Sequence, residues 1–122
     1  MTIDKQIDHT KRMVVLTISG ELTDKSLLSL ADAVKKAPGV AKDFSLLIDL
    51  RGADGQKITT AGVQNLAAQP LVLSPESRRA VVVPSTLGFG MARMYELMRG
   101  TGGMRVFRDY DDARRWIETG AE

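Results

Sequence analysis

The sequence predicts a single mixed α/β domain over residues 1–122, with five strands in a mixed, mostly parallel sheet and four helices packed against it. Short apolar runs rich in β-branched residues are typical of buried strands, and they recur along the chain. From the second run onward, each is followed by a capping residue and by apolar residues at helical spacing. Strand–helix–strand connections need crossovers, which favour parallel pairing. The expected order is β-β-α-β-α-β-α-β-α.

The N-terminal segment predicts a hairpin followed by a helix. Ile3–Asp8 is expected to form the first strand, and His9–Arg12 a polar turn. Met13–Ser19 is strongly enriched in β-branched residues, so it predicts a second strand that pairs antiparallel with the first. Thr23 is expected to cap the next helix, and Ala37–Gly39 to end it. The apolar face of this helix comprises Leu27, Leu30, Ala31 and Val34.

The middle of the chain predicts one strand–helix unit. Phe44–Leu50 contains a continuous apolar run, which is typical of a strand buried on both faces. Arg51–Lys57 contains Gly and Asp and is expected to be a loop. Thr59 or Thr60 then caps a helix, and Leu71–Ser77 is a connector. The apolar residues of this helix are Val63, Leu66 and Ala67.

Ala80–Val83 predicts a strand covered on both faces, and we expect it in the middle of the sheet. Pro84 ends this strand because proline lacks the N–H that a ladder needs. Ser85 or Thr86 is expected to cap a helix that Gly100 ends. The face of that helix expected to be apolar comprises Leu87, Met91, Met94, Tyr95 and Met98.

The C-terminal segment predicts the last strand and the last helix. Met104–Phe107 is a short strand, and Asp109 is placed to cap the helix after it. Gly120 follows the end of that helix, as glycine commonly does. The helix is expected to bury Ala113, Trp116 and Ile117.

Composition and charge narrow the classes of function. The chain has 122 residues, 43% of them hydrophobic, and no cysteine, which excludes disulfides and thiolate chemistry. Its net charge of +2 comes with closely interleaved arginines and acidic residues toward the C-terminus, a pattern that argues against a nucleic-acid-binding stripe. No window holds the roughly 20 apolar residues of a membrane span, and the N-terminus lacks an apolar signal core. We therefore expect a cytoplasmic protein with no nucleic-acid or membrane partner, no metal and no cofactor.

The predicted element order, with LLIDLRG before a Thr-rich helix start, resembles the STAS fold of anti-sigma-factor antagonists. Three segments carry a closer resemblance, to small stand-alone bacterial proteins of the SpoIIAA-like family. They are LLIDLRGAD, RRAVVVPSTLGFGMARMYELM and MRVFRDYDDARRWI. The resemblance runs from about Met13 to Ile117 and implies the fold, but it carries no known activity.

In phosphoregulated STAS antagonists an Asp-Ser-Ser-Gly run opens the helix after the strand that matches Phe44–Leu50. In those proteins a partner kinase phosphorylates the second serine, so the resemblance implies a phosphoacceptor at this helix start. The matching run here is Thr59, Thr60, Ala61 and Gly62. Ala61 stands at the phosphoacceptor position and Thr59 at that of the Asp, while Thr60 can substitute by a one-residue shift. The alternative is that a threonine there only caps the helix.

Two further groups of residues have the chemistry of an anion or ligand site. Gly88 and Gly90 open a helix with Arg93 one turn on, which would let a ligand approach the backbone. The alternative is that these glycines allow close helix–sheet packing and that Arg93 pairs with a neighbour. Asp49 lies near the carboxyl end of its strand beside Arg51, where open α/β sheets bind ligands, although local hydrogen bonding also explains it.

These observations lead to two functional hypotheses. The first is a non-catalytic protein-interaction or regulatory module that forms a homodimer or binds a protein partner, with Met91, Met94 and Met98 as interface residues or as core. The second is a sensor that binds a small ligand, an anionic or apolar metabolite or a nucleotide, at the carboxyl edge of the sheet. We do not expect an enzyme, since the only histidine, His9, falls in a polar turn and no nucleophile motif accompanies it.

Overall fold

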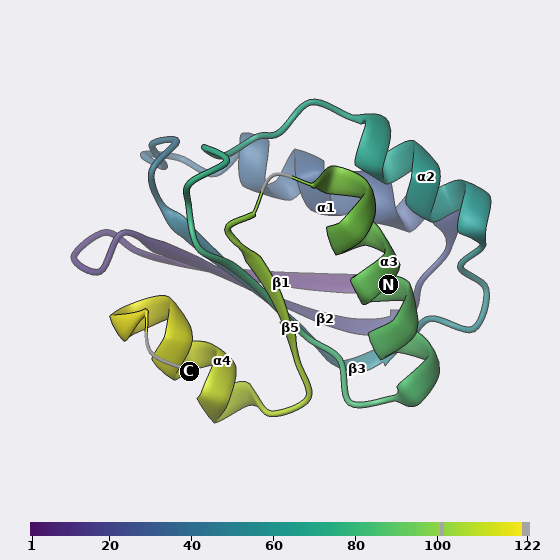
Figure 1. Ribbon diagram of the computed structural model, residues 1–122. Helices are drawn as coiled ribbons and strands as arrows, with labels where there is room; N and C mark the ends of the chain where they lie inside the picture. Colours follow the sequence, from purple (N-terminus) through teal and green to yellow (C-terminus); the bar gives the residue numbers. More distant parts are fainter. Residues whose placement is uncertain (101, 121–122) are drawn as a thin grey trace.

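The computed structural model describes residues 1–100 and 102–120 and has a twisted sheet at its centre (Figure 1). Within these residues five strands lie in the order β1-β2-β3-β4-β5; β1 is antiparallel to β2, and the other pairs are parallel. The strands are β1 Thr2–Asp8, β2 Met13–Glu21, β3 Ser45–Asp54, β4 Arg79–Val82 and β5 Met104–Phe107. The helices are α1 Asp24–Lys35, α2 Thr60–Ala68, α3 Thr86–Arg99 and α4 Tyr110–Thr119. The predicted fold class and element order are confirmed.

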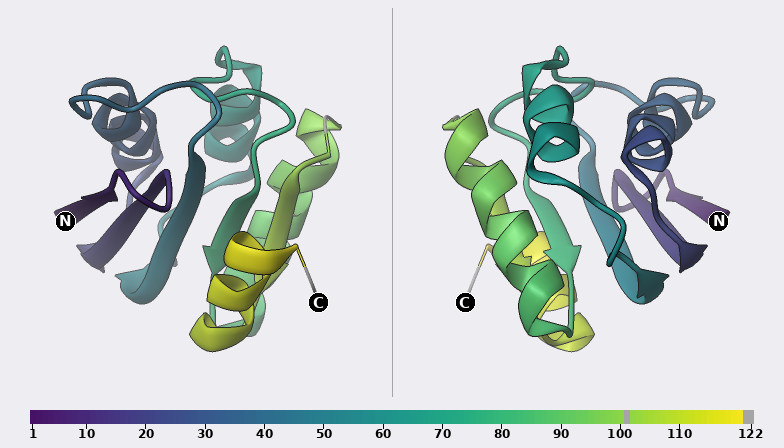
Figure 2. Two further views of the ribbon diagram at one scale, coloured as in Figure 1. Left: turned by 90° about the vertical axis from the view of Figure 1, so that its left-hand side faces the viewer. Right: turned by 90° about the vertical axis from the view of Figure 1, so that its right-hand side faces the viewer.

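The helices are divided between the two faces of the sheet. Successive strand residues point to opposite faces, so Leu46 contacts the α1 side while Leu47 packs beneath α4. Figures 1 and 2 show α1 and α2 on one side of the sheet and α4 on the other. The face under α4 is closed by Trp116 and Ile117, which are 8% and 5% exposed. This half of the molecule is a well-filled core.

Local capping signals fix the starts of all four helices. In each case the capping side chain accepts a hydrogen bond from a backbone N–H three residues later, which satisfies one of the unpaired donors of the first turn. The capping residues are Thr23, Thr59, Ser85 and Asp109. Where the sequence left two candidates, the structure selects Thr59 over Thr60 and Ser85 over Thr86.

Two expectations about the strands are wrong. β3 continues to Asp54, through residues expected to belong to a loop that starts at Arg51, because Ser19–Glu21 of β2 pairs with Gly52–Asp54 after a register shift. Pairing with an extended neighbour thus overrides the weak strand propensity of the Gly- and Asp-containing segment. β3 is also the central strand of the sheet, whereas β4 lies between β3 and β5, one place from the edge.

The face of α3 that contacts the sheet shares Tyr95 with the predicted face but is otherwise rotated from it. Ala92 and Tyr95 pack against β4 and β5, while Leu87 and Met98 are 60% and 39% exposed. At 3.6 residues per turn, the contacting face is rotated by roughly a quarter of a turn from the Leu87–Met98 stripe. A Cβ at Gly88 would collide with the side chain of Val83, so glycine there lets the helix approach the strand. No described helix is long and apolar enough to span a membrane.

Candidate functional site

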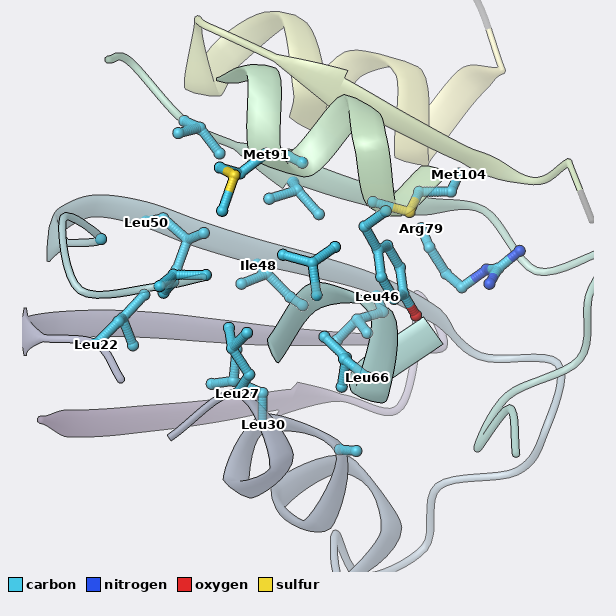
Figure 3. Close-up of a pocket in the computed structure, with 18 of the residues that line it drawn as sticks. Leu22, Leu27, Leu30, Leu46, Ile48, Leu50, Leu66, Arg79, Met91 and Met104 are labelled. Carbon is cyan, nitrogen blue, oxygen red and sulfur yellow. The ribbon is translucent and has the colours of Figure 1, made fainter. Parts of the chain in front are cut away.

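A cavity of about 240 Å³ lies between the sheet and helices α1, α2 and α3 (Figure 3). Its lining is mostly aliphatic, with Leu46, Ile48 and Leu50 of β3 along one side. Leu27 and Leu30 of α1 and Leu66 of α2 lie opposite, and Met91 of α3 closes part of the wall. The volume corresponds to about eight water molecules at ~30 Å³ each.

The cavity exists because the helices leave the central strand incompletely covered. Ile48 and Leu50 lie on β3 and face the helices, yet both are only half-buried, whereas Leu47 on the opposite face is 0% exposed. α3 presents Gly88, which has no side chain, and Ala92, which has only a methyl group, so the helix does not fill this space. Protein interiors are normally close-packed, with few voids larger than a water molecule. At about 240 Å³ this apolar space is somewhat smaller than the ~300–1,000 Å³ of common ligand pockets, so it suits a small ligand.

One end of the cavity is cationic. Arg79, the first residue of β4, is 7% exposed and donates to the carbonyl oxygens of Ser77 at 3.2 Å, Pro75 at 3.2 Å and Gly102 at 2.6 Å. Burial lowers the pKa of Arg79; the interaction with Tyr95 raises it and the charge of Arg99 lowers it, and the pKa stays below its ordinary value. Arg99 donates through Nε to the Tyr95 hydroxyl at 3.0 Å. All three residues line the cavity, so its aliphatic lining ends at two arginines and a tyrosine.

The N-terminus of α2 is held by a carboxylate from α1. Asp24 accepts hydrogen bonds from the Thr59 backbone N–H at 2.9 Å and from the Thr59 hydroxyl at 2.6 Å. These bonds lower the pKa of Asp24. A Cβ at Gly62 would collide with the Asp24 carboxylate. The chain therefore supplies its own anion at this helix start, which supports the capping interpretation; Thr60 and Ala61 are exposed, and phosphorylation of Thr60 stays a prediction.

Asp49 and Arg51 form an ion pair on the opposite face of the sheet, beside α4. Asp49 is 4% exposed, and its carboxylate accepts from the Arg51 backbone N–H and Nε, both at 3.0 Å, and from a terminal guanidinium nitrogen at 2.9 Å. The guanidinium lies 4.5 Å from the ring centre of Tyr110. Burial raises the pKa of Asp49, but the bonds and charge of Arg51 outweigh it and leave the pKa below its ordinary value. The pair ties β3 to α4.

Arg51→Met is expected to lower the free energy of unfolding at pH 7 by about 1–2 kcal/mol, because it leaves the Asp49 carboxylate buried without its partner. With a depressed folded-state pKa, Asp49 contributes stability above its unfolded-state pKa of about 3.9 and loses it as the pH falls through the folded-state value. The deficit of the variant should therefore be largest near neutral pH and shrink below about pH 4. Urea denaturation across this range measures it; a deficit that does not change with pH would contradict the prediction.

The predicted glycine and arginine site on α3 does not join the Asp49–Arg51 pair. Gly88 packs closely against Val83, whereas a Cβ at Gly90 would meet nothing within 4 Å. Arg93 pairs with Glu96 at 2.6 Å on the surface of the helix. Asp49 and Arg51 face α4, while α3 lies over the other face of the sheet. Among the predicted site residues only Gly88 and Met91 line the cavity.

The sequence reasoning missed the cavity and its cationic end. The continuous apolar run in Phe44–Leu50 predicts burial on both faces rather than a space beside Ile48, and Arg79 lies just outside the predicted strand Ala80–Val83. A signal for the polar end was present: Tyr95 and Arg99 are four residues apart, so they share the face of α3 that carries the small residue Ala92. A helix face made of small and polar residues, lying beside an apolar strand, indicates unfilled space between the helix and the strand. Among the described residues, no group of three or more His, Asp or Glu side chains is placed to hold a metal ion.

The antiparallel edge strand, the four parallel-paired strands and the helices on both faces define a mixed α/β domain of the SpoIIAA-like fold. The structure is similar to that of an uncharacterized protein of the DUF3478 family with a SpoIIAA-like fold from Shewanella loihica PV-4. The TM-score is 0.61 at 19% sequence identity, over 95% of this chain and 92% of that one.

Sequence comparison then gives the family. The chain belongs to the SpoIIAA-like family, whose model matches residues 13–118. The match covers the same part of the chain as the resemblance found from its motifs, which is thereby confirmed. A comparison with curated proteins finds no match to this chain.

Proposed function

We propose that this protein binds an apolar small molecule in the cavity between the sheet and α1, α2 and α3. The observation that carries the proposal is the half-buried state of Ile48 and Leu50 on the central strand, where a folded domain normally buries its side chains fully. A ligand seated there removes this apolar surface from water, which is favourable by about 25 cal/mol per Å². Binding would thus complete a core that the chain leaves unfilled.

The proposal keeps the small-ligand hypothesis but changes its location. At the carboxyl edge of the sheet Thr60 and Arg93 are exposed, and Arg93 pairs with Glu96. The cavity offers an aliphatic lining under three helices instead. Self-association through the exposed stripe that includes Leu87 and Met98 stays a prediction.

The test is a cavity-filling variant measured with a simple apolar probe. Saturating 1-octanol is expected to raise the melting temperature of the wild type, because a ligand at ten times its Kd adds about 1.4 kcal/mol of stability, or roughly 5 °C in a domain of this size. Ile48→Phe adds volume inside the cavity and should abolish the shift while keeping the fold. The matched control is Leu28→Phe, because Leu28 is 41% exposed on α1 and lies outside the cavity.

Calorimetric titration with the same probe gives the stoichiometry. One saturable site in the wild type and in Leu28→Phe, absent in Ile48→Phe, supports the proposal. Equal shifts in all three proteins, or no saturable binding in the wild type, would refute it.

A further inference from the structure

The two ends of the cavity differ in chemistry, and the difference indicates how a ligand is oriented. Leu50 and Ala53 line it near the carboxyl end of β3. Arg79, Tyr95 and Arg99 line the other end, where Arg79 pairs with Leu46 near the amino end of β3. A molecule that is apolar throughout would leave the arginine end without a complementary group.

We propose that the ligand is a straight-chain carboxylate whose head group binds Arg99 and Tyr95 and whose chain lies along Leu46, Ile48 and Leu50. This inference rests on the proposed function and names the class of ligand for the same cavity. A carboxylate can accept two parallel hydrogen bonds from a guanidinium fork, and such charge-assisted bonds are stronger than neutral ones.

The hydrogen bonds of Arg99 favour it as the residue that contacts the head group. Its Nε bond to Tyr95 fixes one side of the guanidinium, whereas a terminal nitrogen reaches the Leu66 carbonyl only at 3.5 Å, a long and weak contact. The guanidinium of Arg99 therefore has N–H donors available to a ligand at this end of the cavity. The Tyr95 hydroxyl, which accepts from Arg99, has its own proton to donate to a carboxylate oxygen.

Arg79 has a different part in the same site. Its guanidinium is held in place by the carbonyl oxygens of Pro75, Ser77 and Gly102, so it supplies a fixed positive charge rather than a mobile ligand contact. Arg79 and Arg99 are close enough for the charge of one to lower the pKa of the other. An anion between them offsets this repulsion, which a neutral head group cannot do.

The shape and lining of the cavity select the rest of the ligand. Leu46 and Leu50 are four residues apart on one strand, so the cavity wall they form is ~13 Å long. Leu27, Leu30 and Ile48 offer no hydrogen-bond donor to a sugar or a base, which argues against a nucleotide. A single alkyl chain with one small anionic group matches this combination of length, small volume and charge.

The experiment compares octanoate with 1-octanol, which has the same chain and a neutral head group, by calorimetric titration. The wild type should bind octanoate about tenfold more tightly than 1-octanol, the change that one charge-assisted hydrogen bond gives. Arg99→Met should lose about tenfold in affinity for octanoate while its affinity for 1-octanol changes by less than about twofold. Tyr95→Phe should also lower the affinity for octanoate, by a smaller factor. It provides a second variant if Arg99→Met does not fold.

The matched control is Arg93→Met, because Arg93 lies on the same helix, pairs with Glu96 and does not line the cavity. It should bind both probes as the wild type does. If 1-octanol binds as well as octanoate and Arg99→Met changes neither affinity, the head-group inference is wrong and the proposed function stands. If neither probe binds the wild type at a saturable site, both are wrong.

Discussion

Leu47→Ala is expected to lower the free energy of unfolding by about 3–5 kcal/mol, the range for deleting a leucine from a core that cannot collapse around the gap. Leu47 is 0% exposed on the central strand and packs with Val82, Trp116 and Ile117 beneath α4. The strands on either side of β3 are fixed by their ladders, so the neighbouring side chains cannot move in to fill the space.

Urea denaturation of two further leucine variants makes the prediction specific to this face. Leu50→Ala, which lines the cavity and is already half-buried, should cost about 1–2 kcal/mol, because less packing is lost. Leu97→Ala should cost less than about 0.5 kcal/mol, since Leu97 is 72% exposed. A cost for Leu47→Ala no larger than that for Leu50→Ala would mean that the two faces are packed alike and would weaken the case for the cavity.

The features that the sequence predicted correctly are those with local causes. Each helix begins where a side-chain oxygen can cap it, as at Thr23 and Asp109, and a capping bond spans only three residues. The mostly parallel pairing followed from the alternation of strands and helices, because successive strand–helix units need crossover connections. The burial of Trp116 and Ile117 also has a local cause, because their helical spacing places them on one face of α4.

The features that were missed depend on distant parts of the chain. The segment Arg51–Asp54 has weak strand propensity by itself and becomes a strand because the end of β2 pairs with it. The orientation of α3 is set by how closely the helix can approach Val83, so Gly88 and Ala92 face the sheet although the Leu87–Met98 stripe is more hydrophobic. Hydrophobic periodicity identifies an apolar face but not the distance between helix and strand.

The cavity could not be predicted from the sequence for a related reason. Ile48 and Leu50 have the same residue types as a filled core, and only the positions of three separate helices show that space remains above them. The charges at its end come from Arg79 at the start of β4 and Arg99 at the end of α3, which are 20 residues apart in the chain and lie near each other only after folding. Arg99 is a basic residue in the last turn of α3, a position where basic residues are common without any ligand.

Arg79→Met is expected to lower the free energy of unfolding by about 2–4 kcal/mol in the absence of ligand, because it removes a buried donor group from several carbonyl oxygens at once. The guanidinium joins the turn at Pro75 and Ser77, before β4, to Gly102, before β5. Methionine has a similar length but cannot donate a hydrogen bond, so these oxygens lose their partner where water has limited access.

Arg79→Met should weaken the connection before β4 and β5 locally as well as lower the global free energy of unfolding. A simple packing defect would not have this local effect. The backbone N–H of Arg79 donates to Gly103 at 2.7 Å and belongs to the same connection, so its hydrogen exchange should accelerate more than that of amides under α4. Arg93→Met is the matched control, and as a surface variant it should change stability by less than about 0.5 kcal/mol. If Arg79→Met were as stable as this control, the guanidinium would contribute charge to the cavity without holding its end together, and the fixed position of Arg79 in the proposed ligand site would have to be abandoned.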